Sequence, residues 1–208
     1  VFQEDQQGTA MISGAGIVNG LEIANRKAED TRVVVYGAGA AGIAGARYYM
    51  TLGIQPENIF MFDSKGHISK DRTDLNAMKK PFALQKHHTV AEALKGAHMF
   101  MGFSVNDLLT PELIILMDKD PIIFACANPD PEIAYPVAKK ARPDGIIGTG
   151  RSDYPNQINN VSGFPYIFRG ALDVAATEIN EAMKLAATCA LAELAKEPVP
   201  DEVSAAYD

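Results

Sequence analysis

The hexapeptide Gly37–Gly42 constrains this chain more than any other feature, because it reads G-x-G-x-x-G between two regular elements. The β-branched run Arg32–Tyr36 before it predicts a strand, and the helical spacing of Ala44, Tyr48 and Leu52 after it predicts a helix. In this context the first glycine permits a tight turn, the second lets a pyrophosphate approach the backbone, and the third lets helix pack against strand. Phosphates would meet the unpaired N–H groups at the helix start. The sequence therefore predicts a dinucleotide-binding turn, although an isolated motif of this kind is also compatible with a purely structural bend.

The residue Asp63 closes the next apolar run, Ile59–Phe62, about 20 residues past the last glycine. A carboxylate at this place can hold the adenosine ribose hydroxyls, which favours NAD and repels a 2′-phosphate. Ser64 and Lys65 follow directly and Lys79–Lys80 lie a short way on, so these cations can neutralise an extra phosphate. Such lysines are equally typical of a solvated surface. The residues by themselves leave NADP and NAD both open.

Three further apolar runs of strand length occur at Met99–Phe103, Ile122–Ala127 and Gly145–Gly148, separated by polar or helical stretches. The runs are continuously apolar, which suits strands buried on both faces of a parallel sheet covered by helices. Long helical patterns are predicted from Gly8 to Arg26 and from Ala171 to Leu194. We therefore predict an α/β fold, a doubly wound, mostly parallel sheet of the Rossmann type with long flanking helices at both ends. Since no internal linker interrupts the pattern, residues 1–208 are interpreted as one domain.

The composition excludes several classes of partner. A formal charge of −7 and a pI near 5.1, without a basic block, argue against nucleic acid. The chain has no export signal and no uninterrupted apolar stretch of about 18 residues, so no membrane association is expected.

Cys126 and Cys189 are too few for a disulfide framework, which predicts a reducing, cytoplasmic location. The histidines show no zinc-ligand spacing and are expected to be surface or packing residues: His67, His87, His88 and His98.

Two acidic residues, Glu4 and Asp5, precede Gly8–Thr9 and the first predicted helix. The segment Val1–Asp5 is interpreted as extended, and adjacent side chains of an extended segment point to opposite sides, so only one of the two acids should face a given site. Mg²⁺ commonly takes one or two protein carboxylates together with water and substrate oxygens. One carboxylate here is therefore an incomplete metal site. Acids ahead of a helix N-terminus are also ordinary surface residues.

Three asparagines are candidate ligand-binding residues. Asn128 follows the predicted strand Ile122–Ala127 and precedes Pro129, and strand ends in α/β sheets line the ligand crevice. Its amide both donates and accepts, which suits a carboxylate or a nicotinamide amide, although Asn-Pro is also typical of a turn. Asn159 and Asn160 follow a long polar stretch and could either hold a substrate or cap local backbone.

Five segments together closely resemble the malic enzymes, especially those of bacteria: Phe2–Ala10, the glycine turn, Phe62–Gly66, Ala127–Pro129 and Gly150–Asn160. The resemblance covers nearly the whole chain. The first and last segments are distinctive to this family, whereas the glycine turn occurs in many dehydrogenases. The resemblance implies oxidative decarboxylation of malate to pyruvate and CO₂ with reduction of NAD(P), assisted by Mg²⁺ or Mn²⁺.

The resemblance also assigns roles to residues. It implies that Asp5 is one of three acidic metal ligands, with Glu4 beside it as a weaker candidate, and that Asn128 and Asn160 contact the substrate and the nicotinamide end. The substrate-binding residues expected on this basis are Asn128, Asn159 and Asn160. Lys80 falls near the place where NADP-using members carry a phosphate-binding lysine, and Ser64-Lys65 is similar to those members, so NADP is favoured over NAD. The cofactor-binding residues expected are Thr9, Gly37, Ala38, Gly39, Ala40, Ala41, Gly42, Asp63, Ser64, Lys65, Lys80 and Asn128.

The resemblance further implies what this chain lacks. In the family, the catalytic Tyr and Lys and the other two metal ligands come from an N-terminal domain that would precede Val1, so no catalytic residue is expected here. Glu197–Glu202 is similar to a family segment that normally continues, and both ends are therefore expected to be truncated. A fragment of this kind should bind cofactor but be inactive alone, and the full-length enzyme is expected to be a homo-oligomer. Two alternatives stay open: the cofactor half of an amino-acid dehydrogenase, and a non-catalytic nicotinamide-binding module.

Overall fold

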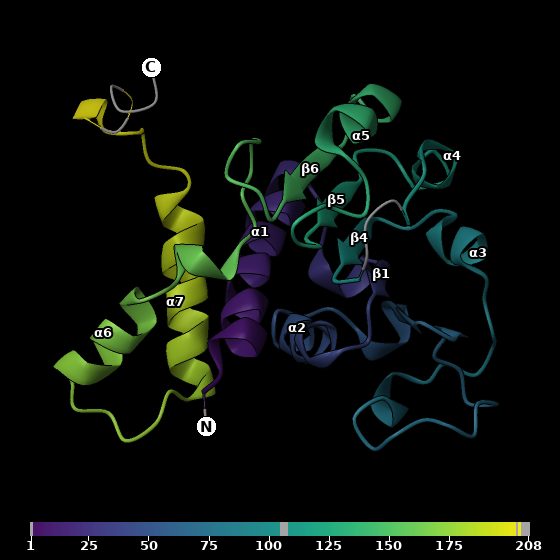
Figure 1. Cartoon of the computed structure of the whole chain (residues 1–208), viewed down its shortest axis with the longest axis horizontal. Helices are drawn as coiled ribbons and strands as arrows, with labels where there is room; N and C mark the ends of the chain where they lie inside the picture. The colour runs from purple at the N-terminus through teal and green to yellow at the C-terminus, as the bar shows by residue number, and fades with distance from the viewer. Residues whose placement is uncertain (1, 105–107, 203, 205–208) are drawn as a thin grey trace.

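The computed structural model describes residues 2–104, 108–202 and 204, and its centre is one six-stranded sheet (Figure 1). The strand order is β3-β2-β1-β4-β5-β6, and every neighbouring pair is parallel except β2 and β3. The strands are β1 (Val33–Tyr36), β2 (Ile59–Asp63), β3 (Gly66–His67), β4 (Met99–Gly102), β5 (Ile122–Ala125) and β6 (Ile146–Thr149). This arrangement confirms the predicted mostly parallel sheet. The short antiparallel strand β3 was not predicted.

Helices cover both faces of the sheet. The α-helices are α1 (Thr9–Ile23), α2 (Ala40–Thr51), α3 (Val90–Leu94), α4 (Pro111–Ile114), α5 (Tyr135–Ala141), α6 (Tyr166–Asp173) and α7 (Glu181–Leu194). Shorter helical turns are η1 (Glu4–Gly8), η2 (Ala28–Asp30), η3 (Pro56–Asn58), η4 (Lys80–Phe82) and η5 (Asn160–Ser162). Among the described residues, no helix combines the length and the apolar character needed to cross a bilayer.

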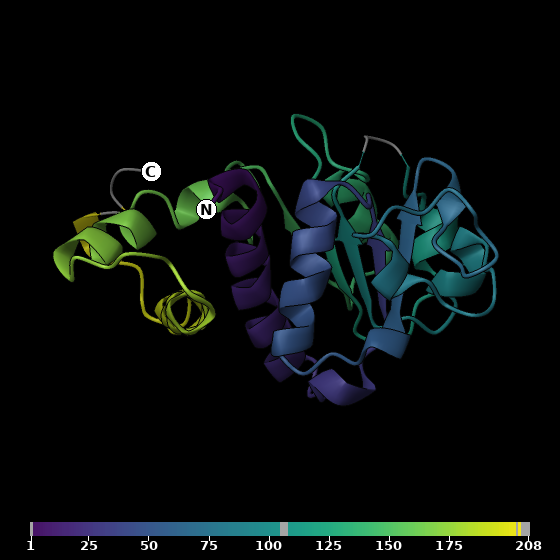
Figure 2. The same cartoon turned by 90° about the horizontal axis from the view of Figure 1, so that it is seen from below.

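The apolar strands form two cores, one on each face. Val33 and Val35 point to one face, where they pack with Ile17 of α1 and Tyr49 of α2, whereas Val34 points to the other. That second core contains one buried residue from each of α3, α4 and α5: Leu94, Ile114 and Ala138. Figure 2 shows α1 and α2, in purple and blue, together on one side of the sheet. The fold is therefore doubly wound, and full burial of a Val or Ile side chain contributes about 1.5–3 kcal/mol to it.

The strand order places a topological switch between β1 and β4. From β1 the chain proceeds to β2 on one side, then crosses back to β4 on the other side of β1. Loops that leave the carboxyl ends of two such strands diverge, and this divergence opens a crevice. The glycine turn follows β1 and Phe103 follows β4, so both border this crevice.

The C-terminal helical pattern from Ala171 to Leu194 was wrong as a single helix. Helix α6 ends at Asp173 and α7 begins at Glu181, with Ala175 at φ +49° between them. A residue in the left-handed conformation cannot continue an α-helix. Helix α7 then begins after Asn180, whose side chain caps it by accepting a hydrogen bond from the N–H of Met183. Val174 continues the apolar spacing past the end of α6, but it is 72% exposed and lies on no buried helix face. Figure 1 shows α7 running beside α1, with α6 on its other side.

Both boundaries of the first helical segment also differ from prediction. Helix α1 ends at Ile23 rather than Arg26, since Asn25 has φ +50°. The segment interpreted as extended up to Asp5 is instead a π-helical turn from Glu4 to Gly8. The argument that its two acids point to opposite sides of a strand therefore does not apply, and their directions follow from the turn and its contacts.

Candidate functional site

The glycine turn joins β1 to α2 as predicted, and its three glycines have three different surroundings. Gly37 has φ +115°, and a Cβ there would lie 2.4 Å from the carbonyl oxygen of Phe103. A Cβ at Gly42 would lie 1.9 Å from the carbonyl oxygen of Gly37, so helix and turn are in direct contact. A Cβ at Gly39 would meet no atom within 4 Å. Close packing thus requires the outer two glycines, whereas the middle one leaves its backbone accessible.

The N–H groups of the turn divide into two sets. Those of Gly37 and Ala38 both donate to the carbonyl oxygen of Phe62, each at 3.0 Å, and so tie the turn to β2. Those of Ala40, Ala41 and Gly42 open α2, where no earlier carbonyl of the same helix is in place to accept them. An anion at this helix start would meet the second set. Ala38, one of the predicted cofactor-binding residues, uses its N–H within the fold.

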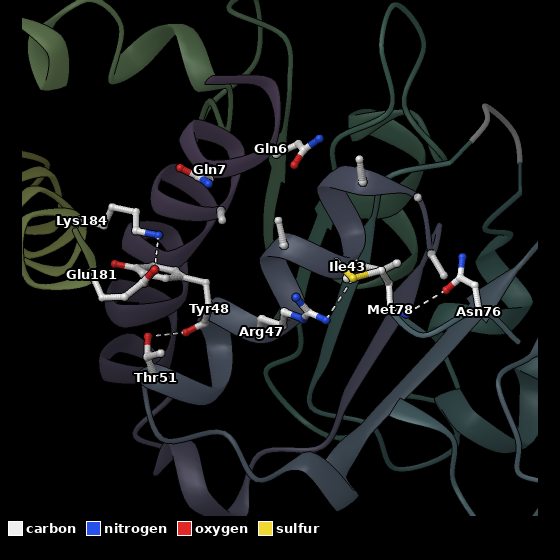
Figure 3. Close-up of a pocket in the computed structure, with 15 residues that line it drawn as sticks. Gln6, Gln7, Ile43, Arg47, Tyr48, Thr51, Asn76, Met78, Glu181 and Lys184 are labelled. Atoms are coloured by element: carbon white, nitrogen blue, oxygen red, sulfur yellow. Dashed lines mark hydrogen bonds and ion pairs between the residues drawn. The ribbon is translucent and has the colours of Figure 1, made fainter. Parts of the chain in front are cut away.

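A groove of about 670 Å³ runs along α2 from the glycine turn (Figure 3). Its walls come from η1, α1, α2, the loop around Asn76 and the start of α7. Arg47 lies in the middle of this groove and donates to the sulfur of Met78, while Lys184 and Glu181 form an ion pair at one end. The groove beside the turn is therefore lined by both polar and apolar side chains.

A second cavity of about 240 Å³ lies at the switch between β1 and β4, and we call it the strand-end cavity. Its lining residues are Asp5, Thr9, Ala41, Phe103, Ser104, Cys126, Ala127, Asn128, Ile158, Asn159 and Asn160. Six of these were predicted as site residues and come from widely separated parts of the chain. The structure therefore brings Asp5 and Asn128 to one cavity beside the start of α2.

The two acids of η1 have different surroundings. Asp5 is exposed and lines the strand-end cavity, and its carbonyl oxygen accepts from the hydroxyl of Thr9 at 2.9 Å. Glu4 instead accepts a hydrogen bond from the side-chain amide of Asn160, and its other carboxylate oxygen is buried without a partner in the described part of the chain. Asp5 is therefore the better placed metal-ligand candidate. Residues 2–104, 108–202 and 204 contain no group of three His, Cys, Asp or Glu side chains that could hold a metal ion.

The three predicted asparagines all line the strand-end cavity but differ in their bonding. Asn159 donates to the carbonyl oxygen of Gly150 at 2.9 Å and accepts from the N–H of Val161 at 3.0 Å. Its amide thus caps local backbone, one of the two alternatives left open. Asn128 is exposed at the cavity, after β5. Asn160 lines the cavity with its amide bound to Glu4.

The carboxylate of Asp63 is surrounded by cations. Arg72 binds both of its oxygens, at 2.8 and 3.1 Å, and Lys79 binds one at 2.6 Å. The N–H of Lys65 donates to it at 2.9 Å. Burial raises the pKa of Asp63, but the hydrogen bonds from Arg72 and Lys79 outweigh burial and lower that pKa to about 2. The predicted ribose-binding acid is therefore ionised and already paired.

The surrounding charges extend to Asp74, which accepts from Lys65 at 2.8 Å and from Arg72 at 2.9 Å. Ser64 is exposed next to this cluster, and Lys80 is exposed at the start of η4. Sequence reasoning missed Arg72. No spacing rule singles out an arginine in a polar loop, and only the folded loop brings it to Asp63.

Comparison with known proteins matches residues 6–205 to the family described as malic enzyme, NAD binding domain. The NADP-dependent malic enzyme of Halomonas elongata is 53% identical over 209 residues, covering 100% of this chain and 50% of that protein. The NAD-dependent malic enzyme of Rhizobium meliloti is 47% identical over 100% of this chain and 27% of that protein. The chain therefore spans half the length or less of these two relatives.

A solved structure gives the same result in three dimensions. The crystal structure of the NAD-dependent malic enzyme from Thermotoga maritima superimposes with a TM-score of 0.87 at 37% identity, covering 97% of this chain and 54% of that chain. The family match, the sequence identities and the shared fold agree. The chain belongs to the malic enzyme family, in which it matches the NAD-binding domain.

Proposed function

We propose that this chain binds NADP in preference to NAD, as the cofactor-binding part of an enzyme that converts malate to pyruvate and CO₂. One observation carries the proposal: Asp5, Asn128 and Asn160 line a single cavity beside the start of α2. Relatives named as NADP-dependent and NAD-dependent malic enzymes support a nicotinamide cofactor.

Each group in this arrangement has a distinct proposed role. The opening N–H groups of α2 bind the pyrophosphate, and Asn128 and Asn160 orient the nicotinamide end and the malate carboxylates. Asp5 offers one oxygen ligand to Mg²⁺ or Mn²⁺. When bound, the nicotinamide supplies a hydride acceptor and the divalent cation a Lewis acid. We assign no general acid or base to this chain, and the family resemblance implies a Tyr and a Lys from another segment.

The charge around Asp63 supports NADP. The ion pairs join three cationic side chains, Lys65, Arg72 and Lys79, to two carboxylates, Asp63 and Asp74, so the cluster has a net charge of +1. An unpaired Asp63 would repel a 2′-phosphate, but a paired one does so far less. Its oxygens are also less available to ribose hydroxyls, which removes the usual reason for NAD selectivity.

Two measurements on the intact protein that contains this chain test the proposal. Calorimetric titration should give tighter binding of NADP than of NAD, and tighter NAD binding contradicts the charge argument. Malate with Mn²⁺ should then produce NADPH, whereas amino acids without metal should not. The reverse result would favour the amino-acid dehydrogenase alternative, and no turnover with either would favour a binding module. The proposed homo-oligomer is tested by the mass of the intact protein in solution.

A further inference from the structure

The side chain of Glu132 is a buried carboxylate that the proposed mechanism does not use. It lies between β5 and α5 and is 0% exposed. Its Oε1 accepts from the N–H of Ser104 at 2.9 Å, and its Oε2 accepts from the N–H of Ala127 at 3.1 Å. Ser104 follows β4 and Ala127 follows β5, so one carboxylate joins the segments that leave two neighbouring strands.

Burial of Glu132 is unfavourable for its charged form and is compensated by hydrogen bonds from backbone N–H groups. Removing a carboxylate from water without a cationic partner is unfavourable, and the ion pairs of the described residues do not include Glu132. Burial raises the pKa of Glu132, and hydrogen bonds from the N–H groups of Ser104 and Ala127 oppose that increase. An apolar side chain could fill the same volume but could not accept from two N–H groups.

The last residue of β4 is adapted to this carboxylate. A Cβ at Gly102 would lie 2.2 Å from Cδ of Glu132 and within 2.5 Å of both carboxylate oxygens. The carboxylate therefore lies against the Cα of Gly102, and only glycine leaves room for it there. Two positions 30 residues apart in the sequence thus form one structural unit.

This unit lies directly behind the strand-end cavity. Ser104 and Ala127 both line that cavity, next to Phe103 and Asn128. A dinucleotide centred on the glycine turn would direct its adenosine half towards Asp63 after β2, on one side of β1. Its nicotinamide half would extend to the other side, towards the ends of β4 and β5.

We propose that Glu132 is a positioning residue, which holds the segments after β4 and β5 at the separation that the nicotinamide end of the dinucleotide requires. The inference rests on the proposed function, because it assumes that a dinucleotide binds here. A glutamine cannot replace the carboxylate, since its amide has one acceptor and one donor group, and the donor would face an N–H.

The test compares two probes in the intact protein, NADP and 2′-phospho-ADP-ribose, which lacks the nicotinamide. Glu132→Gln should weaken NADP binding about tenfold, because the loss of one of its hydrogen bonds lets the segment after β4 or β5 shift from the position that the nicotinamide end requires. Binding of 2′-phospho-ADP-ribose should change by less than about twofold, because its contacts lie on the other side of β1. A residue that only stabilised the fold would weaken both probes alike. Glu57→Gln, an exposed acid on η3, is the matched control and should change neither.

Gly102→Ala tests the same positioning role independently. It leaves Glu132 in place, but its methyl group would displace the carboxylate of Glu132. Gly102→Ala should also weaken binding of NADP more than binding of 2′-phospho-ADP-ribose. The double variant should bind NADP no less tightly than whichever single variant binds it less tightly, because both substitutions act through one unit. Should Glu132→Gln not fold, Gly102→Ala carries the comparison alone. Equal loss of both probes, or no loss of either, overturns the inference. Failure of the unaltered protein to bind either probe contradicts the proposed function instead.

Discussion

The side-chain amide of Asn160 donates a hydrogen bond to the carboxylate of Glu4, across 156 positions of the sequence. This contact ties η5, after β6, to η1 at the start of the chain. Both flanking segments contribute to the strand-end cavity, Asp5 from one and Asn159 from the other. The contact therefore helps to hold the walls of the proposed site together.

Removing the amide of Asn160 should destabilise the protein. In Asn160→Ala the partly buried Glu4 carboxylate loses its partner while its other oxygen already lacks one, which costs about 1–3 kcal/mol. Urea unfolding measures this loss. In a Glu4→Ala background the same change should have little effect, and full additivity of the two substitutions would show that the contact is not the cause.

Two glycines of the turn should separate stability from binding. Gly42→Ala should lower the free energy of unfolding by about 2 kcal/mol, because its Cβ would overlap the backbone oxygen of Gly37. Gly39→Ala should change stability by less than about 0.5 kcal/mol, yet weaken dinucleotide binding, since the new methyl group occupies the path of the phosphates. Thermal melts and NADP titration give the two readouts. A stable Gly42→Ala or a fully binding Gly39→Ala contradicts the roles given to them.

Arg72 should determine cofactor preference. Arg72→Ala leaves Asp63 paired with Lys79 alone and should reduce the preference for NADP over NAD about tenfold, because the net charge of the cluster falls from +1 to 0 and attracts the 2′-phosphate less. Titration of each cofactor measures the ratio. Lys70→Ala removes an exposed lysine of the same loop and is the control. If both variants shift the ratio equally, only the overall charge of the loop matters.

The adjacent acids of η1 should differ in metal binding. Asp5→Asn should weaken Mn²⁺ binding by the intact protein about tenfold or more, since Asp5 lines the strand-end cavity. Glu4→Gln should weaken it much less, because the carboxylate of Glu4 binds Asn160. Electron paramagnetic resonance of free Mn²⁺ gives both affinities. The opposite order would make Glu4 the ligand.

His67 should make the protein less stable in mild acid. The side chain is fully buried among aromatic and histidine rings, and its two nitrogens have no hydrogen-bond partner in the described part of the chain. Burial, together with His88 and His87, lowers the pKa of His67 from 6.5 to about 4. As pH falls between these values, the unfolded chain takes up a proton that the folded protein cannot, so folding loses up to about 3 kcal/mol. Urea unfolding at several pH values should show a smaller loss for His67→Leu, and an equal loss would rule out His67 as the source.

The sequence by itself determined the parts of this protein that depend on local rules. The strand Val33–Tyr36, the glycine turn and the helix after it were predicted because chain stiffness, steric freedom and apolar spacing act over a few residues. Continuously apolar runs likewise predicted buried parallel strands, and hence a crevice at their carboxyl ends near Asn128.

Only the tertiary structure decided which distant groups meet. The pairing of Asp63 with Arg72, of Glu4 with Asn160, and of Glu132 with the strand ends depends on how loops close over the assembled sheet. The break between α6 and α7 was hidden because apolar spacing does not show where the backbone turns, and Val174 at this break is 72% exposed in the structure. Hydrogen bonds and ion pairs act over a few ångströms of space whatever the separation in sequence, so a linear pattern cannot specify them.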